Sequence, residues 1–277
     1  MEGIANNRRL ETLPLTEGQV GIWLMQMLDP EDPCWNIGEC IEIRGRLDER
    51  LFERALRHVL AATDAMHLRF AETDAGPVQY FDHDPCWKLI REDFSSGEDP
   101  EQAARNWMTC DMGRPFRLDD GNLCRFALLR ISEACSFWYA VNHHIINDGV
   151  GWRLLHRRVS EVYSALIDGN PMPPLPDTSW RTIVADQVAY RDSEHFERDR
   201  RYWLGQLAEA PAPITLSGRQ PERPVGYVKA TGRIPHIVDL EEVAERHSAS
   251  PAVVVVAAAA IYIHRMAGGS DMLIGMP

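Results

Sequence analysis

The chain has 277 residues, of which 45% are hydrophobic and 25% are charged, and its formal net charge is −12. These proportions are typical of a globular protein, and the excess of carboxylates argues against binding to the phosphate backbone of nucleic acids. The longest apolar run, 252–263, is shorter than the roughly 20 residues of a membrane-spanning helix. Residues 1–9 have no apolar segment typical of a secretion signal. We therefore expect a cytoplasmic protein that binds neither nucleic acid nor membrane.

The cysteines show neither a C-x-x-C pair nor a spacing to histidine that is typical of metal ligands. We expect free thiols in a reducing compartment and no bound metal. The six cysteines are Cys34, Cys40, Cys86, Cys110, Cys124 and Cys135.

Apolar residues recur at helical spacing after two residues that favour the N-cap position, Thr16 and Asp48. Pro30 and Pro33 follow the first of these stretches and predict its end. A third helix is expected over 99–110. Short or alternating apolar segments predict strands at 37–44, 67–71, 78–81 and 87–92.

Two longer strands are expected at 123–131 and 135–141, joined by a short polar turn. The second is almost wholly apolar, which is typical of a strand that is buried on both faces. A helix over 152–166 follows, and Gly169 is a natural end for it.

Four prolines between residues 170 and 176 predict an extended, semi-rigid linker. Beyond it we expect helices over 180–190 and 196–207, a Pro-, Gly- and Arg-rich loop at 211–226, a helix from Ser250 to about residue 266 and a strand at 271–276. Because a strand needs neighbours, we expect this second part to be incomplete. The predicted organisation is a flexible tail (1–12), a first lobe (13–169), a linker (170–179) and the beginning of a second lobe (180–277).

Two adjacent histidines, His143 and His144, lie between the apolar strand and the helix that follows it, with Asp148 and Gly149 close behind. An imidazole titrates near neutral pH, so a loop that aims one into a cleft is suited to general base catalysis or to positioning an amine. The alternative is a structural histidine pair, buried against backbone carbonyls. Zinc is disfavoured because adjacent strand residues point to opposite faces and no H-E-x-x-H motif is present. A serine nucleophile is disfavoured because the chain has no G-x-S-x-G motif.

The sequence resembles the condensation domains of non-ribosomal peptide synthetases, which share the chloramphenicol-acetyltransferase-like fold. Residues 143–149 match the H-H-x-x-x-D-G motif of that family. Residues 15–24 are similar to its first core motif, 63–70 to its second, and 180–190 to the motif after the linker. The matches follow the order of the family along nearly the whole chain.

The resemblance implies a two-layer α/β sandwich lobe and an incomplete second lobe, with the active site at their junction. It implies that His144 is the catalytic residue, as a base or as a group that positions the amine, and that His143 is structural. Asp148 would hold the loop through an ion pair, and Gly149 would let the loop turn. The second motif of the family often has Arg where this chain has Ala62 and His67, so Arg69 is the candidate partner for Asp148.

The resemblance also implies amide-bond (peptide-bond) formation in secondary-metabolite biosynthesis. The partners would be donor and acceptor carrier proteins, whose 4'-phosphopantetheine arms deliver the substrates, and an adjacent adenylation domain; no cofactor would bind directly. Because Met1 lies close to the first motif, we expect a starter condensation domain. Three alternatives stay open. An epimerisation domain usually has Ser before the Trp of the following helix, where this chain has Gly151. A free-standing acyltransferase of the same fold would use coenzyme A, and a catalytically silent module would only dock partners.

Overall fold

The computed structural model describes residues 11–82, 87–119, 121–175, 179–212, 214, 216, 240–269 and 271–275. The chain divides into two compact units, Met1–Asp192 and Ser193–Pro277. The histidine pair lies in the first unit.

A four-stranded mixed sheet forms the core of the first unit, with the strand order β2-β7-β6-β5. β7 pairs antiparallel with β2 and β6, and β5 pairs parallel with β6. The strands are β2 (Asn36–Arg44), β5 (Leu89–Asp93), β6 (Cys124–Ser132) and β7 (Cys135–His143). The expected pair of long strands is therefore confirmed, and it forms the centre of the sheet.

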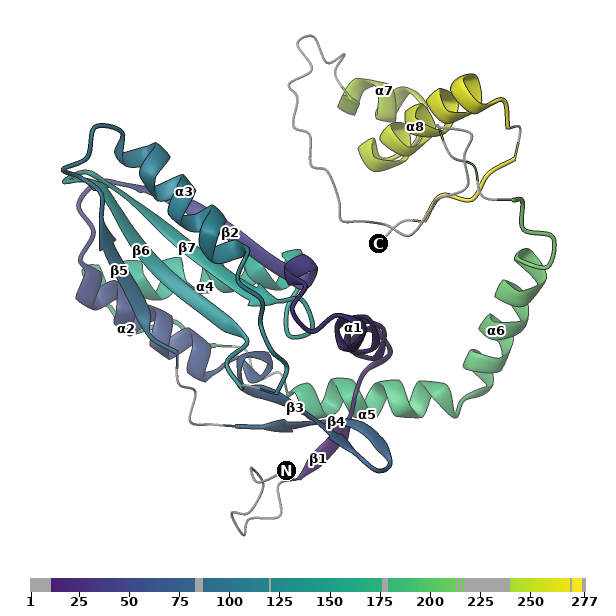
Figure 1. Cartoon of the computed structure of the whole chain (residues 1–277), viewed down its shortest axis with the longest axis horizontal. Helices are drawn as coiled ribbons and strands as arrows, with labels where there is room; N and C mark the ends of the chain where they lie inside the picture. Colours follow the sequence, from purple (N-terminus) through teal and green to yellow (C-terminus); the bar gives the residue numbers. More distant parts are fainter. Residues whose placement is uncertain are drawn as a thin grey trace. The chain divides into compact units, whose positions relative to one another are not determined.

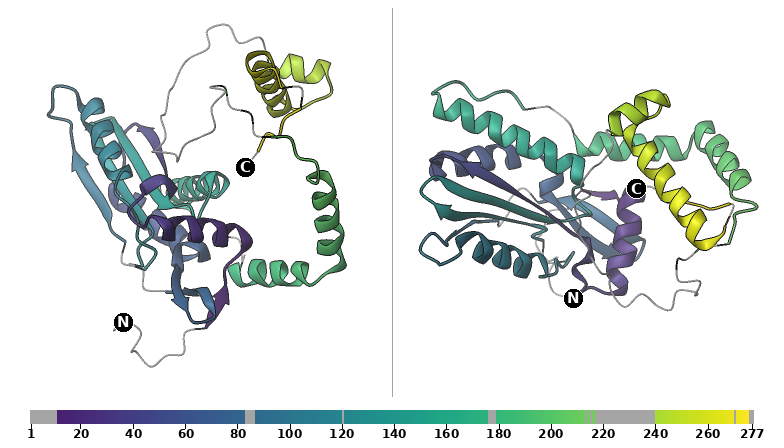
Figure 2. Two further views of the ribbon diagram at one scale, coloured as in Figure 1. Left: turned by 45° about the vertical axis from the view of Figure 1, so that its right-hand side comes forward. Right: turned by 90° about the horizontal axis from the view of Figure 1, so that it is seen from above.

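Helices cover both faces of this sheet. α2 (Glu49–Ala61) and α4 (Gly149–Ile167) lie on one face, and α3 (Pro100–Met112) lies on the other, as Figure 1 and Figure 2 show. Successive residues of β7 point to opposite faces. Trp138 therefore packs against Phe52 of α2, and Tyr139 packs against Trp107 of α3, with ring centroids 5.0 Å and 5.8 Å apart. This double cover explains why the sequence of β7 is almost wholly apolar.

A second, three-stranded antiparallel sheet has the order β1-β4-β3. Its strands are β1 (Thr12–Pro14), β3 (Leu68–Thr73) and β4 (Gly76–Phe81). Short 3-10 turns occupy Pro33–Trp35 and Asp64–His67. The sequence pattern did not predict β1: Thr12, placed in the flexible tail, pairs with Tyr80. Residues 1–10 of that tail lie outside the described residues.

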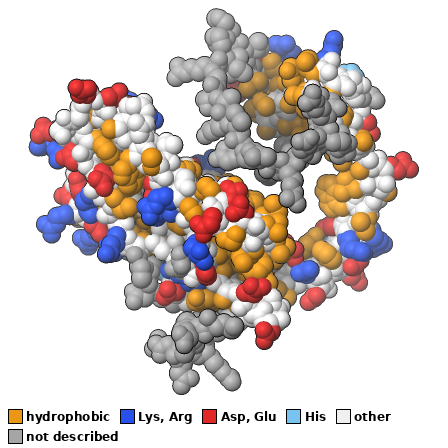
Figure 3. Space-filling model, viewed as in Figure 1, with side chains coloured by type: hydrophobic (Ala, Val, Ile, Leu, Met, Phe, Trp, Pro, Cys, Tyr) orange, Lys and Arg blue, Asp and Glu red, His pale blue; other side chains and the backbone are white. Residues whose placement is uncertain are grey.

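Helix α1 (Glu17–Leu28) begins as predicted. The hydroxyl of Thr16 accepts from the Gln19 N–H at 3.3 Å, and the Gln19 side-chain oxygen accepts from the Thr16 N–H at 2.9 Å, which is a capping box. The outer face of the helix is apolar, with Leu24, Met25 and Leu28 exposed. Figure 3 shows the hydrophobic side chains gathered there.

Helix α5 (Trp180–Arg191) belongs to the first compact unit, although the sequence placed it at the start of the second lobe. The backbone N–H of Trp180 donates to the Asp64 carboxylate at 2.9 Å, and its indole packs against the core of the first unit. The boundary between the two compact units therefore lies after Asp192 rather than at the proline-rich linker.

The described part of the second unit is helical: α6 (Glu194–Gln206), α7 (Leu240–Arg246) and α8 (Pro251–Ala267). The hydroxyl of Ser250 caps α8 by accepting from Val253 N at 3.3 Å, as the sequence pattern indicated. Gly268, with a φ of 73°, ends the helix. The strand expected at 271–276 was wrong for the described residues 271–275, which form no strand and find no pairing partner there. Most of the 211–226 loop lies outside the described residues.

Within the described ranges, no single helix is long and apolar enough to cross a membrane, and no group of His, Cys, Asp and Glu is arranged to hold a metal ion. α7 and α8 meet the length and composition criteria only as a pair, which is bent by 92°.

Candidate active site

The histidine loop is the five-residue connection, 144–148, between the central strand β7 and helix α4. The backbone N–H of His143 donates to Leu123 O at 3.0 Å, and that of His144 donates to Trp35 O at 2.8 Å. Ile145, which follows in the loop, is 3% exposed and belongs to the core. The start of the loop is therefore fixed by backbone hydrogen bonds to Leu123 and Trp35 and by the buried side chain of Ile145.

His144 has a defined tautomer. Its Nδ1 lies 3.0 Å from the carbonyl oxygen of Asn147, which can only accept, so Nδ1 carries the proton. In the neutral ring, Nε2 then bears the lone pair, and no described residue makes a hydrogen bond to Nε2. The ring is half-buried and lies 6.1 Å, centroid to centroid, from the Trp35 ring. This arrangement leaves Nε2 of His144 as a ring nitrogen that can accept a further hydrogen bond.

His143 is fully buried and serves a different purpose. Its Nδ1 accepts from the Ile145 N–H at 3.1 Å, so Nε2 carries the proton and donates to Gln26 Oε1 at 2.9 Å. The Gln26 amide is itself oriented, because its Nε2 donates to Asp29 O and Asp32 O. Burial, with a smaller contribution from the charge of His144, lowers the pKa of His143 to about 4. His143 is therefore a neutral bridge between the loop and α1.

Two further amides hold the neighbouring part of the loop. Gln19 of α1 donates to Ile145 O at 3.2 Å and to Gln79 Oε1 at 3.0 Å. Asn142, which has no exposed surface, donates to His143 O at 2.6 Å and accepts from the Asn147 side chain at 3.4 Å. The loop is thus held by carboxamides, which have no net charge to desolvate.

Asp148 is exposed and is the N-cap of α4, since its carboxylate accepts from the Gly151 N–H at 2.7 Å. Among the described residues it forms no ion pair, and Arg69 does not approach it. The Arg69 guanidinium is buried, lies 3.5 Å from the Asp82 carboxylate and donates to Leu68 O. The predicted ion pair between Asp148 and Arg69 is therefore absent.

His67 stands at one of the positions where the condensation domains often have Arg. Its ring contacts backbone carbonyls rather than Asp148. Its Nε2 lies 3.1 Å from Leu60 O and 3.2 Å from Ala61 O, at the end of α2. This histidine therefore bonds the backbone carbonyls at the end of α2.

Of the two glycines at the start of α4, Gly151 rather than Gly149 is the one whose Cβ position is occupied by neighbouring atoms. Gly149 is the first residue of α4, its φ lies outside the left-handed region, and a Cβ built there meets no atom within 4 Å. A Cβ on Gly151 would collide with the Asn147 side-chain oxygen and lie 3.3 Å from the Asp148 carboxylate. The expectation that Gly149 permits a turn is thus wrong for this loop, and the open space beside it faces solvent.

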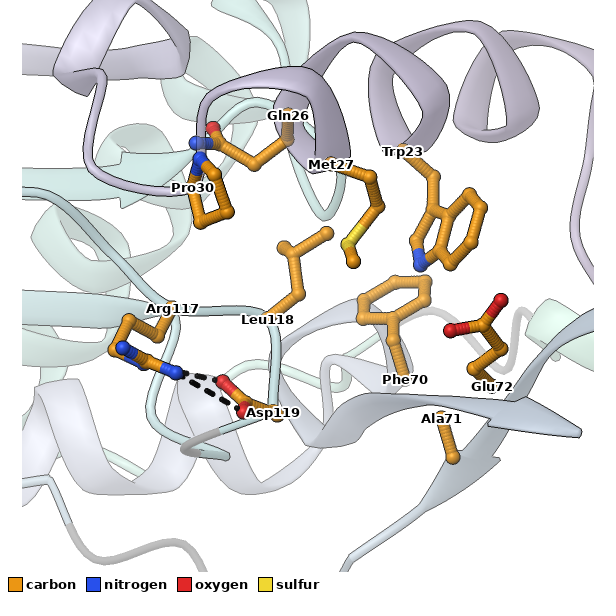
Figure 4. A pocket seen from close by; sticks show the side chains of 10 residues that line it. All are labelled: Trp23, Gln26, Met27, Pro30, Phe70, Ala71, Glu72, Arg117, Leu118 and Asp119. Atoms are coloured by element: carbon orange, nitrogen blue, oxygen red, sulfur yellow. Dashed lines mark hydrogen bonds and ion pairs between the residues drawn. The ribbon is translucent and has the colours of Figure 1, made fainter.

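A pocket of about 280 Å³ lies between α1 and β3, and residues 117–119 also line it, as Figure 4 shows. Its walls are mainly apolar, and Glu72 and Asp119 place carboxylates on its rim, the latter paired with Arg117. Gln26 lines this pocket and also holds His143. The lining residues are Trp23, Gln26, Met27, Pro30, Phe70, Ala71, Glu72, Arg117, Leu118 and Asp119.

Comparisons with known proteins agree with this fold. The first condensation domain of the calcium-dependent antibiotic synthetase, in complex with a substrate analogue, superposes with a TM-score of 0.84 at 35% identity, covering 95% of this chain and 63% of that chain. A variant of the starter condensation domain of rhizomide synthetase RzmA, in complex with C8-CoA, gives a TM-score of 0.85 at 31% identity, with 95% and 60% covered.

These structures define the class as domains of peptide synthetases that assemble peptides without a ribosome. The dimodular nonribosomal peptide synthase of Bacillus subtilis (strain 168) is 38% identical over 265 residues, which are 95% of this chain and 11% of that synthase. The profile of the condensation domain family matches residues 9–277, and the chain belongs to that family. It spans about three fifths of the solved domains and about a tenth of the synthase.

The sequence analysis gave no role to four residues of the site, Gln19, Gln26, Gln79 and Asn142, although Gln19 lies within the first core motif. Gln19 and Gln26 are seven residues apart, so both project from the same face of α1, two turns apart. Polar residues within an otherwise apolar stripe of a helix are the signal that could have identified them.

Proposed function

We propose that this chain catalyses amide-bond formation between an acyl thioester and an amine, as part of a condensation domain, with His144 as the catalytic residue. The observation that carries the proposal is the tautomer of His144, whose Nδ1–H is engaged by Asn147 O while Nε2 is left as an acceptor. Membership of the condensation domain family supports the reaction type.

In the proposed reaction the amine nitrogen attacks the thioester carbonyl, the C–N bond forms and the C–S bond breaks. Nε2 of His144 accepts a hydrogen bond from the amine, which orients it, and can take the proton that the amine loses. The proton then passes to the leaving thiolate, so the ring returns to its starting state. His143 does not compete for this proton, because burial keeps its pKa near 4.

The proposed substrates arrive as thioesters on the 4'-phosphopantetheine arms of donor and acceptor carrier proteins, next to an adenylation domain, in the cytoplasm. The similarity to domains of multimodular synthetases supports this context. A starter placement, with an acyl chain as donor, is supported by the likeness to a starter condensation domain that was solved in complex with C8-CoA. In this proposal Asp148 shapes the loop through the N-cap of α4.

The test is the substitution His144→Ala in a protein that contains this chain and the rest of its condensation domain. We expect product formation from carrier-bound acyl thioester and carrier-bound amine to fall by about 100-fold or more, since general acid–base groups typically contribute that much. Amide product is measured by mass spectrometry, and thermal unfolding is measured in parallel. The matched control is His195→Ala, on the exposed surface of α6, which should leave turnover unchanged.

Unchanged turnover of the His144→Ala variant would remove the catalytic assignment. An epimerase would instead exchange the α-proton of a carrier-bound aminoacyl group with deuterated solvent without forming an amide. A silent docking module would bind the carriers and do neither.

A further inference from the structure

A continuous chain of hydrogen bonds joins helix α5 to the histidine loop. The indole Nε1–H of Trp180 donates to Gln79 Oε1 at 3.0 Å. The same oxygen accepts from Gln19 Nε2 at 3.0 Å, and Gln19 Nε2 also donates to Ile145 O at 3.2 Å. Ile145 directly follows His144. Three side chains from α5, β4 and α1 therefore connect residues that are far apart in sequence.

The direction of every bond in this chain is fixed by chemistry. An indole nitrogen can only donate, so Gln79 must present its oxygen to Trp180. The Gln79 amide nitrogen donates to Pro14 O at 2.7 Å, which agrees with that orientation. The Gln19 oxygen accepts from the Thr16 N–H, so its nitrogen must face Gln79 and Ile145 O. Neither amide can flip without breaking at least two bonds.

Burial makes these bonds costly to lose. Gln79 has no exposed surface, and Gln19 is 4% exposed, so water has little access to a partner that is left unpaired. Trp180 is held in turn, because its backbone N–H donates to Asp64 Oδ2 and its indole packs against the core. A shift of the Trp180 ring would therefore be passed to Gln79 rather than absorbed by solvent.

We propose that Trp180 and Gln79 are positioning residues for His144, and that they set the place of the histidine loop through Gln19 and the Ile145 carbonyl. The part of this inference that concerns catalysis by His144 rests on the proposed function. α5 ends at Arg191, and the first unit ends at the next residue, Asp192. The chain of bonds thus links the loop to the helix that precedes the second unit in sequence.

The first test is spectroscopic and does not depend on any catalytic activity. The imidazole nitrogens of His144 are followed by nitrogen-15 NMR in the 277-residue chain, with the His144→Gln variant used for assignment. In the wild-type chain we expect a protonated Nδ1 and an unprotonated Nε2. Trp180→Phe keeps an aromatic ring but removes the N–H, and we expect the two nitrogen signals to move toward the averaged positions of a ring that exchanges tautomers. Trp203→Phe, at an exposed position on α6, should leave the signals unchanged.

The second test is turnover within a complete condensation domain. Trp180→Phe should lower kcat about fivefold, the value of one net hydrogen bond, with KM unchanged because no substrate contact is lost. In a double-mutant cycle, Trp180→Phe should add little to Gln79→Met, since both break the same chain of bonds.

Unaltered His144 signals in a folded Trp180→Phe variant would overturn the inference, as would additive effects of the two substitutions. If the Gln79→Met protein does not fold, the Trp180→Phe spectra alone decide. If the wild-type protein forms no amide, the proposed function fails, while the response of the His144 signals still supports or overturns the positioning role.

Discussion

The two adjacent histidines differ in their surroundings and in their hydrogen bonds. His143 is enclosed by protein and has both ring nitrogens engaged, as an acceptor from Ile145 N and as a donor to Gln26. His144 is half-buried, with one nitrogen engaged. A buried imidazole without a carboxylate partner resists protonation, and a second positive charge next to it would add to the cost. A neutral His143 therefore helps to keep the His144 site free of a competing base.

The burial of His143 predicts a loss of stability in acid. Its pKa is about 4 in the folded chain, below its ordinary value of about 6.5 in the unfolded chain. Between pH 4 and pH 6.5 the unfolded state binds more protons than the folded state. The stability that a neutral His143 contributes is therefore fully present above about pH 6.5 and is lost as the pH falls toward about 4. From about pH 7 to about pH 4.5, wild-type protein should lose roughly 2 kcal/mol of unfolding free energy more than His143→Gln does.

Urea unfolding at the two pH values measures this difference. His195→Gln, at an exposed position, is the control and should follow the wild type. Equal acid sensitivity of wild type and His143→Gln would mean that His143 is not the neutral, buried group that we infer.

The sequence predicted which residues occupy the histidine loop, but not how they are held. His143 is the last residue of β7, and His144 and Asp148 lie in the connection to α4, between a strand and a helix as the sequence indicated. The partners of Gln79 could not be predicted, because Gln19 and Trp180 lie 60 and 101 residues away in sequence. The predicted ion pair with Arg69 was wrong because the Asp148 carboxylate instead accepts a hydrogen bond from the first turn of its own helix.

At the scale of elements, α1 connects its own N-cap, the core and the histidine loop. The capping box at Thr16 fixes where the helix begins and therefore the rotation of its faces. With that rotation, Gln19 and Gln26 both face the loop, two turns apart. The same geometry turns Leu24 and Leu28 to solvent, where an exposed apolar helix face is typical of a surface that meets another protein or domain.

The start of α4 provides a test of the role of Asp148. As an N-cap, its carboxylate should stabilise the folded chain by about 1 kcal/mol, which Asp148→Ala removes. Asp148→Asn keeps an acceptor oxygen, so it should cost only a few tenths of a kcal/mol, about the spread among good caps. Denaturant unfolding of the three proteins decides the point. An equal loss in both variants would indicate an ion pair instead of a cap.

The two glycines of the same helix start provide a matched pair. Gly151→Ala should lower stability by about 1 kcal/mol or more, because its Cβ meets the Asn147 side chain. Gly149→Ala should leave stability unchanged or raise it slightly, since its Cβ points into open space and alanine favours a helix. Thermal unfolding compares them directly. A larger loss for Gly149→Ala would restore the special backbone role that the sequence suggested.

Local signals predicted most elements, because caps, prolines and apolar periodicity act over a few residues. The expected helices at α1, α2, α3, α4, α5, α6 and α8 are present, with ends that differ by a few residues. β1 was missed because its three residues gain their strand geometry only by pairing with β4. The strand expected at 271–276 was wrong for a related reason: an apolar run becomes a strand only where a neighbour offers hydrogen bonds.

At the scale of the whole molecule, apolar burial is distributed unevenly between the two units. The core cluster of buried residues lies entirely in the first unit. α8 is one of the most apolar helices by sequence, yet none of its residues is buried, and Val253 and Ile261 are 55% and 60% exposed. Because helices in proteins are stabilised mainly by the burial of one face, the two units should differ in stability.

Hydrogen exchange of the 277-residue chain can measure that difference. α8 and α4 have similar lengths, 17 and 19 residues, but α4 buries a stripe that includes Trp152, Val159 and Val162. Local opening requires less free energy where few apolar contacts are broken. We therefore expect the backbone amides of α8 to exchange well before those of α4, and those of β7 to exchange last, because β7 is hydrogen-bonded on both edges and covered on both faces. Equal protection of α4 and α8 would mean that α8 is stabilised by contacts beyond its own unit, and would contradict a second unit of lower stability.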